Sequence, residues 1–228
     1  MKTFALLLAA GSSTRFANNT KKQFFKIKGK EVLYYSLNAF NSSKLIDEII
    51  VVSSLEDIEK IQHLVKVYNF TKVKTVVIGG KLRQESVKKG LEAIKDDGYV
   101  LIHDSARPLV DEKIISSLLT ALKDSDAATP AIKVVDTIVK VKNGELLTFE
   151  NRDELYRIQT PQAFKINVIK EAHQKFEGKE ATDDTQLIKL LGKKVCIIPG
   201  EEKLRKITTL EDTNAIEAYI EQNEHLQN

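Results

Sequence analysis

The sequence predicts an α/β fold with a mostly parallel, twisted sheet, helices on both faces and a projecting β-hairpin arm. Short apolar runs alternate with segments of helical spacing over residues 1–126, which is typical of a parallel sheet covered by helices. After Asp126, two strand-like runs follow each other with little room for a helix between them. Asn143-Gly144, flanked by apolar runs, is a strong hairpin turn signal and predicts the arm.

The first half of the chain alternates between two hydrophobic periods. Glu48–Val52 is rich in β-branched residues and is typical of a buried strand, whereas Leu55, Ile58 and Ile61 recur at helical intervals. The same distinction predicts strands at 4–8, 48–52, 74–78 and 99–102, and helices at 32–40, 55–65, 87–94 and 114–122.

The second half is predicted to carry the arm and a closing α/β segment. Strands at 127–132 and 137–141 lead into the hairpin, whose second strand covers 146–149. Helical patterns cover 168–176, 184–191 and 210–219, and a late strand covers 194–199. Because 228 residues without a repeat or a low-complexity linker suit one large α/β unit, we predict a single domain, 1–228, with the arm at about 136–160.

The composition is that of an ordinary globular protein, with 42% hydrophobic and 29% charged residues. The net charge of +3, from 35 basic and 32 acidic residues, is too balanced for a nucleic-acid footprint. The N-terminus lacks the regions of a signal peptide, and no apolar run approaches the ~20 residues that span a bilayer. We therefore expect a cytoplasmic protein with no nucleic-acid or membrane partner.

A loop of small residues follows the first predicted strand. Ala9, Ala10, Gly11, Ser12 and Ser13 precede Arg15, and Lys22 comes shortly afterwards. Such a loop lets backbone N–H groups approach a polyphosphate while cations face its charge, which suggests chemistry on the phosphates of a nucleotide. The segment lacks the Gly-Lys-Ser/Thr ending of a P-loop and the glycine fingerprint of a dinucleotide fold. Tight strand-to-helix packing is the alternative explanation.

Two further polar segments follow predicted strands, and ligands of open parallel sheets bind beyond the carboxyl ends of the strands. Gly79–Ser86 combines glycines with Ser86, which either hydrogen-bonds a base or caps the next helix. His103–Pro108 contains Asp104, an acceptor for substrate hydroxyls or a neighbour of a metal, and Arg107, which can bind a phosphate bidentately. An internal Asp104–Arg107 ion pair and plain turns are the alternatives.

The histidines are not predicted to be general bases. His103 is expected to be packed or hydrogen-bonded, and His63, His173 and His225 are expected at the surface. Thr182, just before the helix predicted at 184–191, is a candidate N-cap.

The order and wording of these segments carry a family resemblance. Along one chain occur LLLAAGSSTRF, KKQF, GGKLRQESVKKGL, IHDSARPLV, VVDTI, NRDELYRIQTPQAF, ATDDTQL and RKITT. From about Phe4 to the closing helix the chain resembles the 2-C-methyl-D-erythritol 4-phosphate cytidylyltransferases of the non-mevalonate isoprenoid pathway. The resemblance implies a Rossmann-like domain of the nucleotidyltransferase type. It also implies an enzyme that joins CTP to methylerythritol phosphate and releases pyrophosphate.

The resemblance also implies roles for individual residues. Arg15 and Lys22 match the catalytic cations of the family. The positions that hold the cytidine nucleotide are matched by Ala9, Ala10, Gly11, Gly80 and Ser86, and Ser12 and Ser13, in the same loop as Gly11, are expected to bind the nucleotide too. The positions around the sugar phosphate are matched by Asp104, Arg107, Thr137, Arg152, Thr160, Thr182 and Lys206. The expected cofactor is Mg²⁺, held mainly by the CTP phosphates and not by a protein ligand set. The expected partner is a second copy, through an exchanged β arm.

Three positions depart from the family pattern. Ser13 replaces a Gly, Lys21 replaces the Pro before the catalytic lysine, and Leu204 replaces an Asn. Lys21 leaves two lysines that could reach the phosphates, and the following Gln23-Phe24 favours Lys22. A cytidylyltransferase for ribitol 5-phosphate or another alditol phosphate is the alternative within the same chemistry. A catalytically silent nucleotide-binding regulatory protein is the alternative of another class.

Overall fold

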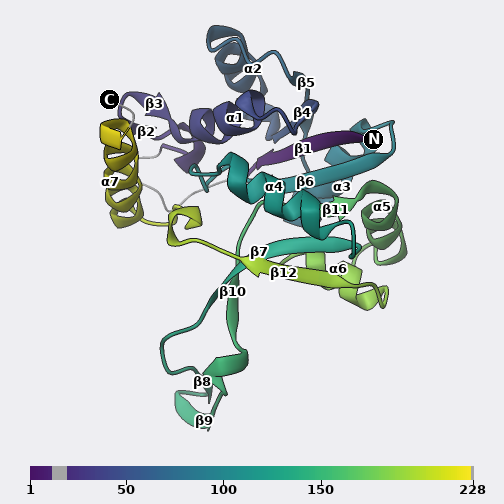
Figure 1. Ribbon diagram of the computed structural model, residues 1–228, viewed down its shortest axis with the longest axis vertical. Coiled ribbons are helices and arrows are strands. Elements are labelled where there is room, and N and C mark those ends of the chain that lie inside the picture. The colour runs from purple at the N-terminus through teal and green to yellow at the C-terminus, as the bar shows by residue number, and fades with distance from the viewer. Residues whose placement is uncertain (12–19, 227–228) are drawn as a thin grey trace.

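The computed structural model describes residues 1–11 and 20–226, and its centre is an eight-stranded sheet (Figure 1). Seven of its strands lie in the order β10-β7-β11-β6-β1-β4-β5, and β12 also pairs with β7. Their bounds are β1 (Lys2–Ala9), β4 (Glu48–Ser53), β5 (Val73–Ile78), β6 (Gly98–Asp104), β7 (Ala127–Lys133), β10 (Tyr156–Ile158), β11 (Gln162–Lys165) and β12 (Val195–Pro199).

The strands predicted in the first half form the parallel part of the sheet. Strand β1 pairs with β4 and β6, and β4 pairs with β5, all in parallel, which confirms the predicted sheet type. Strands β10 and β11 were not predicted, and both run antiparallel to their neighbours. The four-residue β11 is hydrogen-bonded to β6 on one side and β7 on the other, so its neighbours and not its own pattern make it a strand.

Helices cover both faces of the sheet. Alternate residues of β1 show why: Leu7 packs into one hydrophobic cluster and Leu6 into the other, and both are fully buried. The first cluster includes residues of α1 (Val32–Ser42), α2 (Ile58–Val67) and α4 (Glu112–Ala121). The second includes residues of α3 (Arg83–Ala93), α5 (Ile166–Lys175) and α6 (Asp184–Leu190).

Short elements connect this core to a third, smaller cluster. The long helix α7 (Leu210–Leu226) buries Ile216 and Ile220 against Ile27, at the side of the sheet where Figure 1 labels β2 and β3. The remaining short elements of the core are β2 (Lys26–Ile27), β3 (Lys30–Glu31) and the 3-10 turns η2 (Lys22–Phe24), η3 (Leu55–Asp57) and η5 (Glu202–Leu204).

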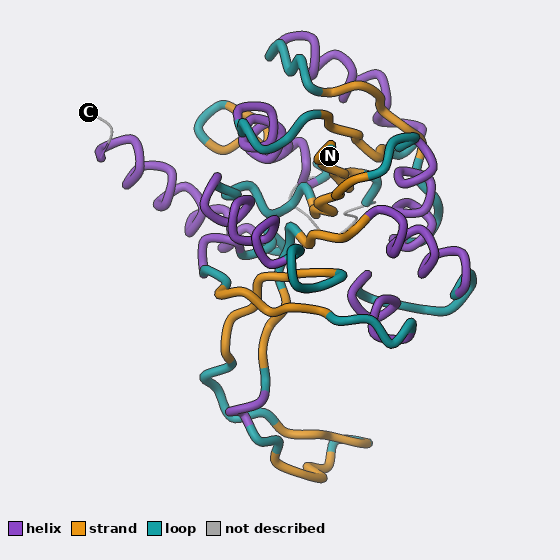
Figure 2. The backbone as a smooth tube through the Cα atoms, turned by 45° about the vertical axis from the view of Figure 1, so that its right-hand side comes forward, coloured by secondary structure: helices purple, strands orange, loops and turns teal. Residues whose placement is uncertain are grey.

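The predicted hairpin arm projects away from the helix-covered sheet (Figures 1 and 2). Its strands are β8 (Val139–Lys142) and β9 (Glu145–Phe149), followed by the 3-10 turn η4 (Arg152–Glu154). Asn143 and Gly144 both have positive φ, 52° and 83°, as a two-residue type I′ hairpin turn requires. Strand β8 begins two residues later than the predicted run at 137–141.

No helix within residues 1–11 and 20–226 is long and apolar enough to cross a membrane.

Candidate active site

The loops that follow β1, β5 and β6 meet at one edge of the sheet, as the sequence predicted. They enclose a cavity of about 450 Å³. Eight residues predicted for the site line this cavity: Ala9, Ala10, Gly11, Lys22, Gly80, Ser86, Asp104 and Lys206. Arg15, Ser12 and Ser13 lie outside the described residues.

Glycine at the end of β5 lets two of these loops approach closely. A Cβ atom at Gly79 would lie 2.7 Å from Ser86 Oγ and 2.9 Å from Ala10 Cβ. The Gly80 N–H donates to Ser86 Oγ at 3.0 Å, and that hydroxyl is 3.1 Å from the Leu82 carbonyl. The Ser86 hydroxyl therefore shapes the loop, and the loop backbone lines the cavity.

The structure separates the two neighbouring lysines. Lys22 lines the cavity, whereas Lys21 Nζ is 2.6 Å from Asp57 Oδ2 at the start of α2. Burial lowers the pKa of Lys22, and the nearby cation of Lys206 lowers it further, while Asp104 opposes both. An ammonium group that is partly desolvated beside another cation favours an anionic ligand.

A second cavity of about 370 Å³ adjoins the first. It is lined by Arg107, Thr160 and Thr182, all predicted to bind the sugar phosphate, and by residues of β10 and the 182–186 segment. Three side chains, Arg83, Asp104 and Lys206, line both cavities. Ligands in the two cavities would therefore be neighbours, and both could contact these three side chains, which we call the shared wall.

Asp104 is the charged centre of the shared wall. Its carboxylate accepts from Lys206 Nζ at 2.7 Å and forms an ion pair with Arg83 Nε at 3.5 Å. Burial alone raises the pKa of Asp104, but Arg83 and then Lys206 outweigh burial and hold the pKa well below its usual value. The ionic partners of Asp104 are therefore Arg83 and Lys206, and not Arg107, the partner in the alternative explanation drawn from the sequence.

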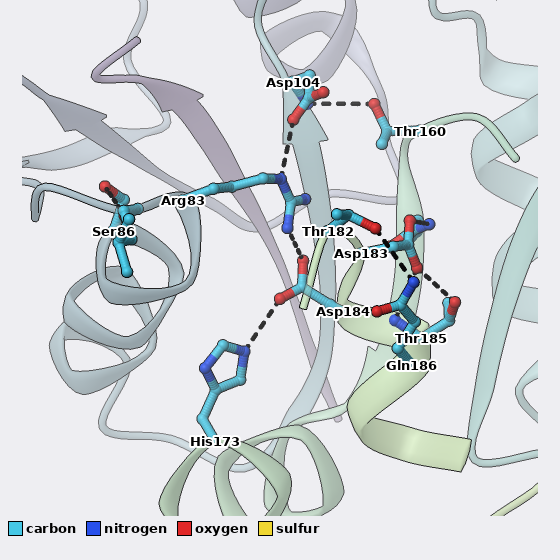
Figure 3. Close-up of polar contacts among 12 residues, drawn as sticks. Arg83, Ser86, Asp104, Thr160, His173, Thr182, Asp183, Asp184, Thr185 and Gln186 are labelled. Carbon is cyan, nitrogen blue, oxygen red and sulfur yellow. Dashed lines mark hydrogen bonds and ion pairs between the residues drawn. The ribbon is translucent and has the colours of Figure 1, made fainter. Parts of the chain in front are cut away.

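A buried chain of polar contacts supports this wall from behind (Figure 3). Arg83 Nη1 donates to Asp184 Oδ2 at 2.6 Å, and His173 Nε2 lies 3.0 Å from Asp184 Oδ1. Burial raises the pKa of Asp184, but Arg83 and then the His173 hydrogen bond outweigh burial, so the net shift is downward. His173 is only 3% exposed, so its predicted place at the surface was wrong.

Arg83 and Asp184 were not predicted as site residues, although both lie in segments that carry the family resemblance. The sequence contained one indication that Arg83 needs an acidic partner. Arg83 is the first residue of α3, where a cation opposes the helix dipole, so a basic residue there calls for an acidic partner elsewhere. The acidic candidates were in the ATDDTQL segment, but their pairing depends on the tertiary structure.

The 103–107 segment is held from the side of β11. Thr160 Oγ1 accepts from the Asp104 N–H at 3.1 Å and lies 3.0 Å from His103 Nδ1, while His103 Nε2 lies 2.9 Å from the Arg107 carbonyl. Burial lowers the pKa of His103 to about 4. His103 is thus hydrogen-bonded, as predicted. Arg107 Nη1 donates to the Leu204 carbonyl at 2.7 Å, so the departure at Leu204 keeps a polar contact through its backbone.

Thr182 lines the second cavity but does not cap α6. The N-cap residue is Asp183, whose side chain accepts from the Thr185 N–H at 2.9 Å. Thr182 Oγ1 instead accepts from Gln186 Nε2 at 3.1 Å (Figure 3). The N-cap predicted from the sequence, Thr182, was therefore one residue too early. The Thr182 side chain is exposed and contacts Gln186.

Thr137 and Arg152 are the two predicted site residues that the fold does not bring to the cavities. Both lie in the arm segment and both are exposed. Arg152 Nη1 donates to the Val135 carbonyl at 3.0 Å, within the arm. Among the described residues, neither lines the two cavities above.

Across residues 1–11 and 20–226, no group of three or more His, Cys, Asp or Glu side chains lies together so that it could hold a metal ion. Asp104 is the single carboxylate among the described residues that line the first cavity, and it already forms ion pairs with Arg83 and Lys206.

Comparisons with known proteins agree on one family. The model of the 2-C-methyl-D-erythritol 4-phosphate cytidylyltransferase family matches residues 3–222. Enzymes of that name from Halalkalibacterium halodurans and Clostridium acetobutylicum are 39% and 41% identical, over 98% and 96% of this chain and 99% and 97% of theirs. The crystal structure of the 4-diphosphocytidyl-2C-methyl-D-erythritol synthase from Anaerococcus prevotii superposes with a TM-score of 0.84, at 31% identity over 96% of each chain.

Proposed function

Because the chain belongs to the 2-C-methyl-D-erythritol 4-phosphate cytidylyltransferase family, we propose that its two adjoining cavities bind CTP and 2-C-methyl-D-erythritol 4-phosphate. The wall of Arg83, Asp104 and Lys206, shared by both cavities, is the observation that carries this assignment. The family match favours this acceptor over ribitol 5-phosphate or another alditol phosphate. It also favours an enzyme over a catalytically silent nucleotide-binding protein.

The chemistry needs no nucleophile from the protein. An oxygen of the acceptor phosphate, already anionic at neutral pH, forms a bond to the α-phosphorus of CTP. The bond from that phosphorus to the bridging oxygen breaks, and its electron pair leaves with pyrophosphate. Catalysis then consists of positioning and charge stabilisation. This fits His103, because burial lowers its pKa and favours the neutral ring. Both ring nitrogens also have partners, the Arg107 carbonyl and Thr160 Oγ1.

Lys22 is the described residue best placed to stabilise the growing charge on the triphosphate. It lines the first cavity, carries a cation that burial has partly desolvated, and lies near Lys206. Arg15 is proposed for the same role from the family resemblance. Backbone groups of Ala9 and Ala10 and of the loop from Gly80 to Ser86 are proposed to select cytosine.

The second cavity is proposed to hold the phosphomonoester. Arg107 and Lys206 present cations to it, and Thr160 and Thr182 add hydroxyl groups. Lys206 lies at the boundary of both cavities, so it can contact the acceptor phosphate on its path to the α-phosphorus. Arg107→Ala is therefore expected to raise the KM for the polyol phosphate more than the KM for CTP.

A Mg²⁺ ion is proposed to be held mainly by the phosphates of CTP, because the described residues that line the first cavity include one carboxylate, Asp104. When bound, the ion would supply positive charge to the triphosphate.

The arm is proposed to complete the second cavity of another copy of this chain. Its exposed apolar side chains include Val141, Leu147 and Phe149, which are 58%, 54% and 69% exposed. Contiguous exposed apolar residues mark interaction sites. Thr137 and Arg152 lie on the same segment, so docking of the arm would carry them to the partner's cavity.

Two measurements test these proposals. Pyrophosphate release from CTP is measured across a panel of polyol phosphates, and methylerythritol phosphate is expected to give the highest kcat/KM. An equal or higher value with ribitol 5-phosphate would reject the acceptor. Lys22→Ala and Arg152→Ala chains are then co-expressed, because one site in each mixed dimer regains both residues. Recovery of activity supports arm exchange, and no recovery places Arg152 at its own chain's site.

A further inference from the structure

The turn that carries Lys22 is tied down by the residues on either side of it. Gln23 Nε2 donates to the carbonyl of Ala9 at 3.1 Å, which fixes the turn η2 to the end of β1. Phe24 is 5% exposed and packs in the main hydrophobic cluster, with Lys60 Nζ 3.8 Å from its ring centroid. The turn therefore contacts both the end of β1, where the proposed nucleotide-binding loop begins, and helix α2.

Lys21 connects the turn η2 to the start of helix α2 through charged and polar contacts. Its Nζ lies 2.6 Å from Asp57 Oδ2 and 3.2 Å from Glu56 Oε2, and Ser54 Oγ is 3.4 Å away. Burial lowers the pKa of Lys21, but the hydrogen bonds to Asp57 and Glu56 outweigh burial and raise the pKa overall. Its side chain is 24% exposed and that of Asp57 only 11%, so water screens this ion pair weakly.

Asp57 lies where the turn η3 continues into α2, with helical backbone dihedrals (φ −103°, ψ −2°) and no side-chain capping bond. Its Oδ2 accepts from Lys21 Nζ and from Ser54 Oγ at 2.7 Å. The carboxylate of Asp57 therefore joins the start of α2 to the turn η2.

We propose that Lys21 is a positioning residue for Lys22, and that its ion pair with Asp57 holds the turn η2 so that Lys22 faces the nucleotide cavity. Lys21 itself is not among the residues that line this cavity. The inference rests on the proposed function only in giving Lys22 the role of a contact to the triphosphate.

The test compares kcat for Lys21→Ala, Asp57→Asn and Lys22→Ala with CTP and methylerythritol phosphate. Removing either partner of the ion pair is expected to lower kcat by about tenfold, because small misplacements of a charge-stabilising group are costly. The KM for the polyol phosphate is expected to stay within about twofold, since these substitutions lie outside its cavity. Lys26→Ala removes an exposed lysine of the next element and is the matched control, with unchanged kcat expected.

A double variant separates positioning from a general structural role. If Lys21 acts through Lys22, Lys21→Ala has no further effect on kcat in a Lys22→Ala chain. A further tenfold loss in that background would overturn the inference, as would a normal kcat for Lys21→Ala. A loss in Lys21→Ala without one in Asp57→Asn would show that Lys21 acts by its own charge. By contrast, a normal kcat for Lys22→Ala alone rejects the role of Lys22 in the proposed function.

Discussion

The edge of the sheet that carries the two cavities and the hairpin arm differ in which side chains they expose to solvent. At the edge, charged groups are largely removed from water: the side chains of Asp104 and Asp184 are 14% and 2% exposed, and each has cationic or hydrogen-bonding partners in the same chain. On the arm, large apolar groups face solvent, and Phe149 is 69% exposed. The first region pairs its buried carboxylates within one chain, whereas the second exposes apolar surface of the kind that proteins ordinarily bury.

This difference indicates what each region needs to function. The charged groups of the edge are paired within one chain, and its cations suit the anionic ligand proposed above. The exposed apolar groups of the arm suit the second copy of the chain proposed above, because binding would remove them from water. Changes at the edge should therefore act on catalysis and stability within one chain, and changes on the arm should act on association.

The largest effect is expected at Lys22. Lys22→Ala removes a preorganised cation from the nucleotide cavity, and losing one such group typically lowers kcat by roughly 10²–10³. The same scale is expected for Arg15→Ala. Thermal unfolding should show an intact fold in both variants. Turnover close to that of the parent chain would remove the residue from its proposed role.

Asp184→Asn tests whether the edge depends on its buried support. Arg83 would keep Asp104 as an ionic partner, and losing the charged hydrogen bond to Asp184 is expected to cost about 1.5–3 kcal/mol of unfolding free energy. Chemical denaturation measures this loss. Glu177→Gln removes an exposed ion pair with Lys88 on the neighbouring surface, where a change under about 1 kcal/mol is expected. Equal losses in the two variants would contradict the special role of the buried chain.

His103 should make the stability of the edge depend on pH. Its pKa in the fold, about 4, lies below the ordinary value of 6.5, so the unfolded chain binds a proton first as the pH falls. The contribution is complete above pH 6.5 and is lost as the pH falls toward 4, by roughly 3 kcal/mol. Below that range, the lowered pKa values of Asp104 and Asp184 continue the loss. Denaturation of a His103→Gln chain should show a flatter profile between pH 6.5 and 4, and a parallel profile would contradict this assignment.

The smallest effect is expected on the arm. Phe149→Ser removes an exposed apolar group, so the unfolding free energy of one chain should change by less than about 0.5 kcal/mol. If the arm binds a second copy, the dimer dissociation constant should rise by about tenfold, as sedimentation at several concentrations would measure. An unchanged association state would separate Phe149 from any interface.

Local patterns were enough to predict most of the framework. The apolar strands, the amphipathic helices and the Asn143-Gly144 turn depend on residues close together in the sequence, and all of them are present. The convergence of the three polar loops also followed from the sequence, because parallel strands place their carboxyl ends at one edge.

The tertiary structure alone decided which charges meet. Arg83 and Asp184 are 101 residues apart, and Lys206 and Asp104 are 102 apart, so no local spacing marks them as partners. The sequence favoured Lys22 over Lys21 through the following Gln23-Phe24, and the structure supplies the physical difference, because Lys21 pairs with Asp57 whereas Lys22 lines the cavity. Secondary structure arises from neighbours along the chain, but ion pairs form wherever folding removes two opposite charges from water together.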